Sequence, residues 1–78
     1  MRKANKIRTQ IWMCERWYKV GDHTIPIRGV CRAMTRKRAQ QRAAEGCEAA
    51  NQQLTATHGV EPGTPQGHAI ALYPIAYA

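Results

Sequence analysis

The sequence predicts an α+β fold: a small antiparallel sheet, in the order β-β-α-β, with one helix packed on one face. Three observations support this prediction: two runs that alternate as strands do, a helical stripe of small residues, and a final apolar run. Seventy-eight residues suffice for one small domain. We expect a basic N-terminal arm at residues 1–6 and a single α+β domain at residues 7–78.

Residues 7–20 have the composition of a first strand, whose alternate side chains point to opposite faces. We predict that the core-facing set is Ile7, Thr9, Ile11, Met13 and Trp17. Glu15 interrupts this set, which suggests a bulge or a frayed end there. The outward set is then Arg8, Gln10, Trp12, Cys14, Arg16 and Tyr18.

The turn signal Gly21-Asp22-His23 separates the first run from a second one at residues 24–34, so a hairpin is expected. In the second run the predicted core face holds Ile25, Ile27, Gly29, Cys31 and Ala33. The predicted outward face holds Pro26, Arg28, Val30 and Arg32. Pro26 lacks an N–H group, which favours an edge strand.

A helix is predicted from a cap at Thr35 to about Leu54. Its inner stripe consists of Ala39, Ala43, Gly46, Cys47, Ala50 and Leu54. These residues are nearly all small, and Gly46 would permit the closest approach to the sheet. Residues 55–67 are rich in Gly and Pro and predict a loop, or a loop with a short strand around Val60. The apolar C-terminal segment 68–78 predicts a last strand at 68–73, stopped by Pro74, or a contact with a partner.

Charge is distributed very unevenly along the chain. The net charge is +7, and all twelve Lys and Arg residues lie between Arg2 and Arg42. Such a balance predicts a polyanionic partner, either nucleic acid or an acidic protein surface in a complex that handles it. The odd cysteine count, and the lack of a secretory signal or of about 20 consecutive apolar residues, predict a cytoplasmic protein that does not enter a membrane.

A basic aromatic face is the predicted binding site. The outward strand positions Arg8, Trp12, Arg16, Tyr18, Arg28 and Arg32 would share it, and the helix start would add Arg36 and Lys37. Cations neutralise phosphates, while Trp and Tyr rings can stack on bases. Two alternatives stay open: the basic residues are merely solvated, or Trp12 is covered by the C-terminal segment.

The residues do not predict an enzyme, a cofactor or a metal site. The chain has no serine and a single Asp, and no two carboxylates form an evident acid/base pair. Cys14, Cys31 and Cys47 are far apart in sequence and have no His close by, unlike structural zinc ligands.

Residues Thr35–Ala44, TRKRAQQRAA, resemble the start of the last helix in double-stranded RNA-binding domains. This resemblance implies phosphate contacts by Arg36 and Lys37. The first helix of that family is missing here, and Cys31-Arg32-Ala33-Met34 replaces its glycine-rich approach to the basic pair.

In size, in its alanine-lined helix and in its lack of enzyme motifs, the chain resembles small phage and mobile-element inhibitors of the anti-CRISPR type. The resemblance implies a non-enzymatic protein that blocks a nucleic-acid-handling complex, such as a CRISPR effector, in the host cytoplasm. The rival hypothesis is a direct RNA- or single-stranded-DNA-binding module, and a third is a structural subunit of a larger particle. A thin core also allows a homodimer.

Overall fold

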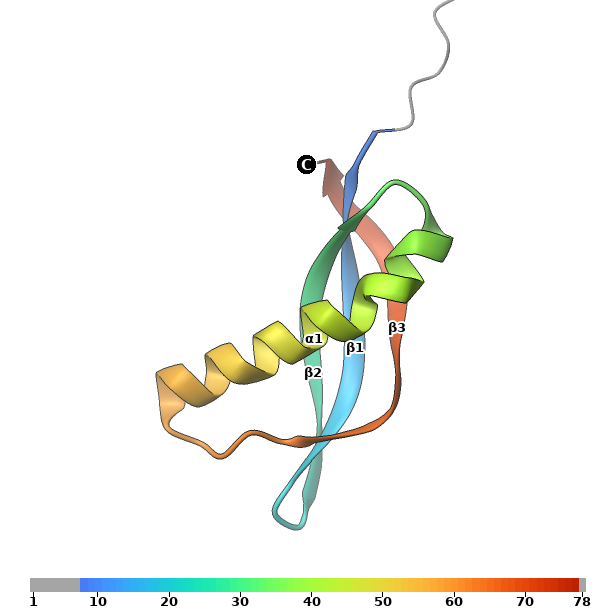
Figure 1. Ribbon diagram of the computed structural model, residues 1–78. Helices are drawn as coiled ribbons and strands as arrows, with labels where there is room; N and C mark the ends of the chain where they lie inside the picture. Colours follow the sequence, from blue (N-terminus) through green and yellow to red (C-terminus); the bar gives the residue numbers. More distant parts are fainter. Residues whose placement is uncertain (1–7, 78) are drawn as a thin grey trace, which may run out of the picture.

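The structure, a computed structural model, describes residues 8–77. It contains β1 (Gln10–Val20), β2 (His23–Ala33), α1 (Arg36–His58) and β3 (Thr64–Tyr77), as Figure 1 shows. The predicted α+β class and the β-β-α-β order are confirmed. The predicted basic arm at residues 1–6, and Ile7 of the predicted first strand, lie outside the described residues.

The three strands form one antiparallel sheet in the order β2-β1-β3, so β1 is central and the other two are edge strands. The helix α1 lies across one face of this sheet: it begins over β3 and runs over β1 towards β2 (Figure 1). Its C-terminal part continues past β2, and residues 59–63 return from there to β3.

Local signals explain the hairpin and both ends of the helix. Gly21 takes a positive φ of 62° in the turn between β1 and β2, a backbone conformation that favours glycine. The Thr35 side chain caps α1 by accepting a hydrogen bond from the backbone N–H of Arg38 at 3.2 Å. The helix ends at Gly59, whose left-handed φ of 70° is a common helix stop.

Two boundaries differ from the prediction. The helix runs to His58 rather than Leu54, because Gly59 is the first residue that stops it. The last strand covers Thr64–Tyr77 rather than residues 68–73, so the loop between helix and strand spans residues 59–63 and is shorter than the predicted 55–67. Pro74 does not end the strand, because β3 is an edge strand and a proline there need not donate to a neighbouring strand.

The pairing of β1 with β3 contains three register shifts, whereas β1 and β2 pair continuously from Gln10↔Ala33 to Val20↔His23. One of these shifts falls between Glu15 and Trp17, where β3 bulges around Gly67 with a φ of 70°. The expected irregularity near Glu15 therefore exists, and it lies in the pairing with β3.

Amide side chains of α1 hold β3 in place. Gln40 accepts a hydrogen bond from the Ala71 backbone N–H at 2.8 Å and donates to the Ala69 carbonyl at 2.5 Å. Asn51 bonds the backbone N–H and carbonyl of Gly63, with distances of 3.4 and 3.3 Å. These bonds explain why Asn51 is buried despite its polarity.

The core lies between α1 and the sheet and is built mainly from small residues. One cluster contains Cys14, Tyr18, Ile27, Ala43, Cys47 and Ala69, and the other contains Trp12, Cys31, Ala33, Ala39 and Ala71. Among the described residues, the large apolar side chains that are buried are Trp12, Tyr18 and Ile27, whereas ten others are exposed. The fold therefore leaves most of its large apolar side chains at the surface.

Candidate binding surface

The two faces of β1 are the reverse of the prediction. Trp12 is 5% exposed and Tyr18 is fully buried, and both lie under α1. Trp12 and Tyr18 face α1 because the buried residues of the helix are small. Ala39, Ala43 and Cys47 leave space that only bulky side chains from the sheet can fill. The proposed stacking of Trp12 and Tyr18 on bases is therefore not available in this fold.

Arg16 also points to the helix side of the sheet. Its guanidinium donates through Nε and Nη2 to the Gly67 carbonyl, at 2.9 and 2.6 Å. This carbonyl belongs to the bulge of β3, so Arg16 satisfies an acceptor at an irregular point of the sheet. Arg16 thus has a structural role that its sequence position did not reveal.

Arg36 lies at the first turn of α1 and over the edge of the second core cluster. Its guanidinium sits 5.1 Å from the centre of the Trp12 ring and donates from Nη1 to the carbonyls of Ala71 and Leu72, each at 3.1 Å. Trp12 in turn donates its indole N–H to the Ala33 carbonyl at 3.1 Å. Arg36 therefore ties the helix start to β3, while Lys37 beside it is exposed.

Of the eight predicted site residues, the structure places only Arg28 and Arg32 on the sheet face that points away from α1. Their partners across the sheet are Glu15 and Ile11, respectively. The Arg28 Nε lies 3.7 Å from the Glu15 carboxylate, which is a weak ion pair because Arg28 is largely exposed. The predicted outward face of β2 is thus correct, and its partners on β1 are different from those expected.

The face of the sheet that points away from α1 is largely apolar and is not covered by another element of the described residues, and we call it the open face. Cross-strand pairing assigns to it Met13 with Val30 and Tyr73, and Glu15 with Arg28 and Ile70. Trp17 lies further along the same face and is 48% exposed. The open face is defined by Ile11, Met13, Trp17, Val30, Ile70 and Tyr73, with Glu15, Arg28 and Arg32 among them.

Other cations gather where α1 begins, and we call this region the basic end. Gln10 pairs with both Ala33 and Tyr77, so all three strands meet there. Arg42 donates from Nη1 to the Arg32 carbonyl at 3.0 Å, and the guanidinium of Arg8 lies 4.4 Å from the centre of the Tyr77 ring. The basic end comprises Arg8, Arg32, Arg36, Lys37, Arg38 and Arg42.

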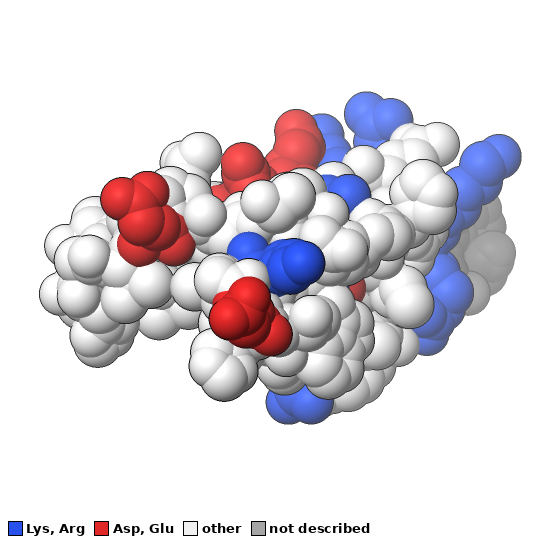
Figure 2. Space-filling view, turned by 90° about the horizontal axis from the view of Figure 1, so that it is seen from below, with Lys and Arg blue, Asp and Glu red and all other residues white. Residues whose placement is uncertain are grey.

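Acidic side chains lie mostly elsewhere. In Figure 2 most of the Asp and Glu residues in view lie over the left half of the molecule, and most of the Lys and Arg residues over the right half. The charge separation seen along the sequence therefore persists in space. A polyanion would meet the basic end with little competition from the molecule's own carboxylates.

The three cysteines meet in the core but form no disulfide. The Sγ atoms of Cys14 and Cys47 are 3.4 Å apart, and Cys31 donates towards the Ala39 carbonyl at 3.5 Å. Burial raises the pKa of Cys14 to about 12, and the neighbouring Cys47 adds to the effect. Burial also raises the pKa values of Cys31 and Cys47, so these thiols are poor nucleophiles at neutral pH.

Within residues 8–77, no group of three or more His, Cys, Asp or Glu side chains is arranged to hold a metal ion. Over the same residues, no helix is at once long enough and apolar enough to cross a membrane.

Comparison of the chain with protein-family models, with curated proteins and with solved structures finds no match. The fold and its surfaces therefore define the chain as a small α+β protein with one uncovered sheet face.

Sequence reasoning missed three exposed members of the open face, namely Trp17, Ile70 and Tyr73. A signal for Trp17 was present, because Trp17 pairs with Pro26, which the alternation of β2 already placed outward. Cross-strand partners share a face, so the hairpin register alone would have turned the odd positions of β1 outward.

Proposed function

We propose that this chain is a non-enzymatic binding protein that acts by occupying the surface of a protein partner, and that the open face makes the contact. The observation that carries the proposal is that exposed large apolar side chains, namely Trp17, Val30, Ile70 and Tyr73, share one uncovered face of the sheet. Large exposed apolar patches on soluble proteins usually mark interaction sites.

The composition of the open face supports a protein partner. Trp17, Tyr73 and Met13 are residue types enriched at interfaces, and Arg28 and Arg32 lie beside them. Aromatic and Arg side chains also dominate the binding energy of most interfaces. A partner with an apolar contact surface bordered by carboxylates would complement this arrangement.

The setting we propose is inhibition of a nucleic-acid-handling complex, in the manner of proteins of the anti-CRISPR type. The basic end supports this setting, because a complex that holds nucleic acid offers phosphates beside its protein surfaces. Contact through the open face would give affinity, and contact through the basic end would raise the association rate.

A pull-down with the tagged protein from its native cells tests the proposal. Wild-type protein is compared with a Trp17→Glu, Ile70→Glu double variant, in which two exposed side chains of the open face become charged. An Ala44→Glu, Gln52→Glu variant adds the same charges at exposed positions of α1 and is the matched control. We expect a nuclease-resistant partner that the control retains and the open-face variant loses. Equal capture by all three proteins would contradict the proposal.

A second candidate function rests on the basic end: direct binding of nucleic acid through its phosphates. If about five phosphates are contacted, log K against log salt has a slope of about −4. The measurement is anisotropy of labelled single- and double-stranded oligonucleotides from low to high salt. A Lys37→Glu, Arg38→Glu variant should bind more weakly if this candidate is correct, and the open-face variant should bind normally.

A further inference from the structure

The outer edge of β2 differs from the outer edge of β3. On β3, the side chains of Gln40 and Arg36 form hydrogen bonds with the backbone. The groups they bond belong to Ala69, Ala71 and Leu72. Along Arg28–Arg32 of β2, the described residues supply one such bond, from Arg42 to the Arg32 carbonyl. Most of the outer edge of β2 is therefore free to pair with another strand.

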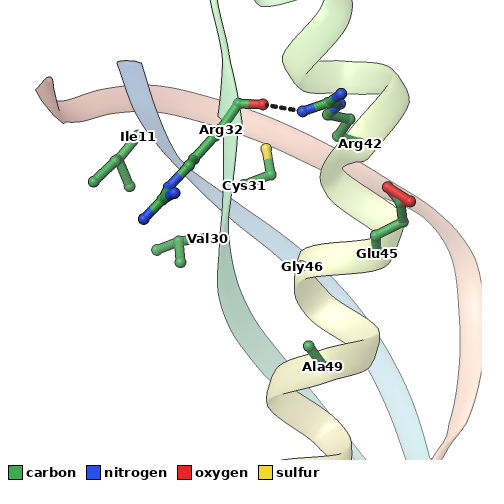
Figure 3. A pocket seen from close by; sticks show the side chains of 8 residues that line it. All are labelled: Ile11, Val30, Cys31, Arg32, Arg42, Glu45, Gly46 and Ala49. Carbon is green, nitrogen blue, oxygen red and sulfur yellow. Dashed lines mark hydrogen bonds between the residues drawn. The ribbon is translucent and has the colours of Figure 1, made fainter. Parts of the chain in front are cut away.

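The register identifies the free groups on this edge. The Arg32 carbonyl accepts a hydrogen bond from Arg42 of α1, which indicates that it points outward from β2 (Figure 3). Backbone groups of alternate residues in an antiparallel strand point to the same side, so those of Val30 and Arg28 also point outward. Val30 thus presents an N–H at the middle of the free edge, while its carbonyl lies against the backbone of Gly46 in α1.

Hollows follow this edge where an added strand would lie. A hollow of about 390 Å³ is lined by Val30 and Arg32 from the sheet and by Arg42, Gly46 and Ala49 from α1. Figure 3 shows Val30 and Arg32 directed away from α1, with the residues of α1 on the other side of β2. The hollow therefore extends along both faces of β2. A strand added beside β2 would also have side chains on both faces.

Two further hollows continue the first along β2. One of about 340 Å³ shares Val30, Gly46 and Ala49 with it. The next, of about 270 Å³, lies between Arg28 and the last turns of α1, where it is lined by Leu54 and His58. Together they form one groove, bordered by β2 on one side and by α1 on the other.

The helix extends beyond the sheet it covers. Asn51 is its last buried residue, and Gln52–His58 continue past β2 (Figure 1). Seven residues of helix span about 10 Å, and adjacent strands are about 4.8 Å apart, so this part of α1 could cover one more strand. Leu54, which is exposed here, would then pack on the added strand.

Charge and alternation define the occupant. On the open face Arg28 and Arg32 flank Val30, so an added strand should place carboxylates there. Its alternate residues would lie under Ala49 and Ala50 of α1 and should be apolar. A second copy of β2, paired antiparallel about Val30, would bring Arg28 opposite Arg32 of the other copy, and like charges disfavour that arrangement.

We propose that the outer edge of β2 accepts an extended segment of a partner protein as a fourth strand, and that this segment alternates acidic and apolar residues. Such strand addition derives affinity from the backbone and specificity from alternate side chains. The inference concerns the backbone edge of β2 rather than the open face, and it stands or falls separately from the proposed contact of that face.

A defined peptide tests this inference without knowledge of the partner. The probe is a fluorescent, end-capped heptapeptide that alternates valine and glutamate, and its binding to the full chain is followed by anisotropy. Two comparison peptides are used: one with lysine in place of glutamate, and one with N-methyl groups on alternate amides, which cannot form the ladder. We expect saturable binding of the probe and affinities about tenfold lower for both comparison peptides.

Variants of the protein locate the site. Val30→Pro removes the outward N–H but leaves the ladder with β1, and Val30→Thr is its control because it retains both shape and N–H. We expect Val30→Pro to lower the affinity about tenfold and Val30→Thr to leave it within about twofold. Leu54→Glu, at an exposed position of α1, should also weaken binding, and it covers the case in which Val30→Pro does not fold.

Amide exchange supplies a direct readout, since the Val30 amide should become protected when the probe binds. Absence of probe binding, or equal binding to Val30→Thr and Val30→Pro, would overturn the proposal. Equal binding of the N-methylated peptide would also overturn it, because the probe would then bind through charge attraction and not through backbone hydrogen bonds. A dimer at working concentration that Val30→Pro dissociates would assign the edge to a second copy instead, and would also overturn it.

Discussion

The backbone of Gly46 in α1 lies directly against the backbone of Gly29 in β2. A Cβ atom on Gly29 would collide with the carbonyl of Gly46, and a Cβ atom on Gly46 would collide with the carbonyl of Val30. Neither glycine needs a positive φ, so close approach is the reason for both. This contact sets how near the helix lies to the sheet, and hence which side chains fit between them.

Gly29→Ala and Gly46→Ala should each lower the free energy of unfolding by about 3 kcal/mol, because backbone atoms must move apart. For Gly46→Ala the loss opposes a gain of about 1 kcal/mol in helix propensity. Urea denaturation measures both, with Gln52→Ala on the exposed side of α1 as a control expected to change stability by at most about 0.5 kcal/mol. Unchanged stability of Gly46→Ala would show that the helix is not held this close.

Tyr18→Phe should leave stability equal or raise it by about 1 kcal/mol. The Tyr18 hydroxyl is buried and has no hydrogen-bond partner among the described residues. Removal of a buried polar group without a partner removes a desolvation cost while the ring keeps its packing. Thermal or urea unfolding tests this, and exposed Tyr73→Phe serves as the control. A clear loss of stability would mean that the hydroxyl has a partner in solution.

The cysteine pKa shifts predict alkaline sensitivity. The pKa of Cys14 is raised from 9.0 to about 12, so the folded state retains a proton that the unfolded chain releases above pH 9. The stabilisation is complete below pH 9 and is lost as the pH rises from 9 towards 12. Urea unfolding at pH 8, 9 and 10 should show falling stability, with a shallower fall for Cys14→Ala. A pH-independent result would contradict the burial of the thiol.

The same burial predicts slow thiol chemistry in the native protein. We expect 5,5′-dithiobis(2-nitrobenzoate) to react slowly with the folded chain at pH 8 and to react rapidly with all three cysteines in denaturant. Fast reaction of one cysteine without denaturant would place that thiol outside the core.

Arg36 should contribute to stability, whereas its neighbour Lys37 should not. Arg36→Lys keeps the charge but loses the planar group that lies over Trp12 and bonds the carbonyls of Ala71 and Leu72. We expect a loss of about 1 kcal/mol for Arg36→Lys and no measurable change for exposed Lys37→Ala. Equal effects would indicate that Arg36 is an ordinary surface cation.

The sequence was sufficient for the elements whose signals are local. Thr35, Gly21 and the alternation of β2 each specify structure through nearby backbone, and Gly46 marked the close approach in advance. The alternation within β1 alone did not decide its orientation, because Ile11, Met13 and Trp17 on one side balance Trp12, Cys14 and Tyr18 on the other. The register of the hairpin with β2 carries that information. Tertiary packing against the small helix stripe decides the orientation.

Only part of the site was predicted, because the faces of β2 were assigned correctly and those of β1 were not. Arg28 and Arg32 belong to β2, whose faces were assigned correctly, and they lie on the open face. Trp12, Tyr18 and Arg16 belong to β1 and lie on the helix side. The length of β3 depended on its edge position, which no local signal around Pro74 reveals.

Site-specific photocrosslinking in native cells tests most directly whether the open face is the contact surface. A benzophenone amino acid is placed at Trp17 or Ile70 on the open face and, as the control, at Gln52 on α1. We predict one protein adduct that forms from Trp17 and Ile70, persists after nuclease treatment and does not form from Gln52. Adducts from Gln52 alone, or from none of the three positions, would contradict the account.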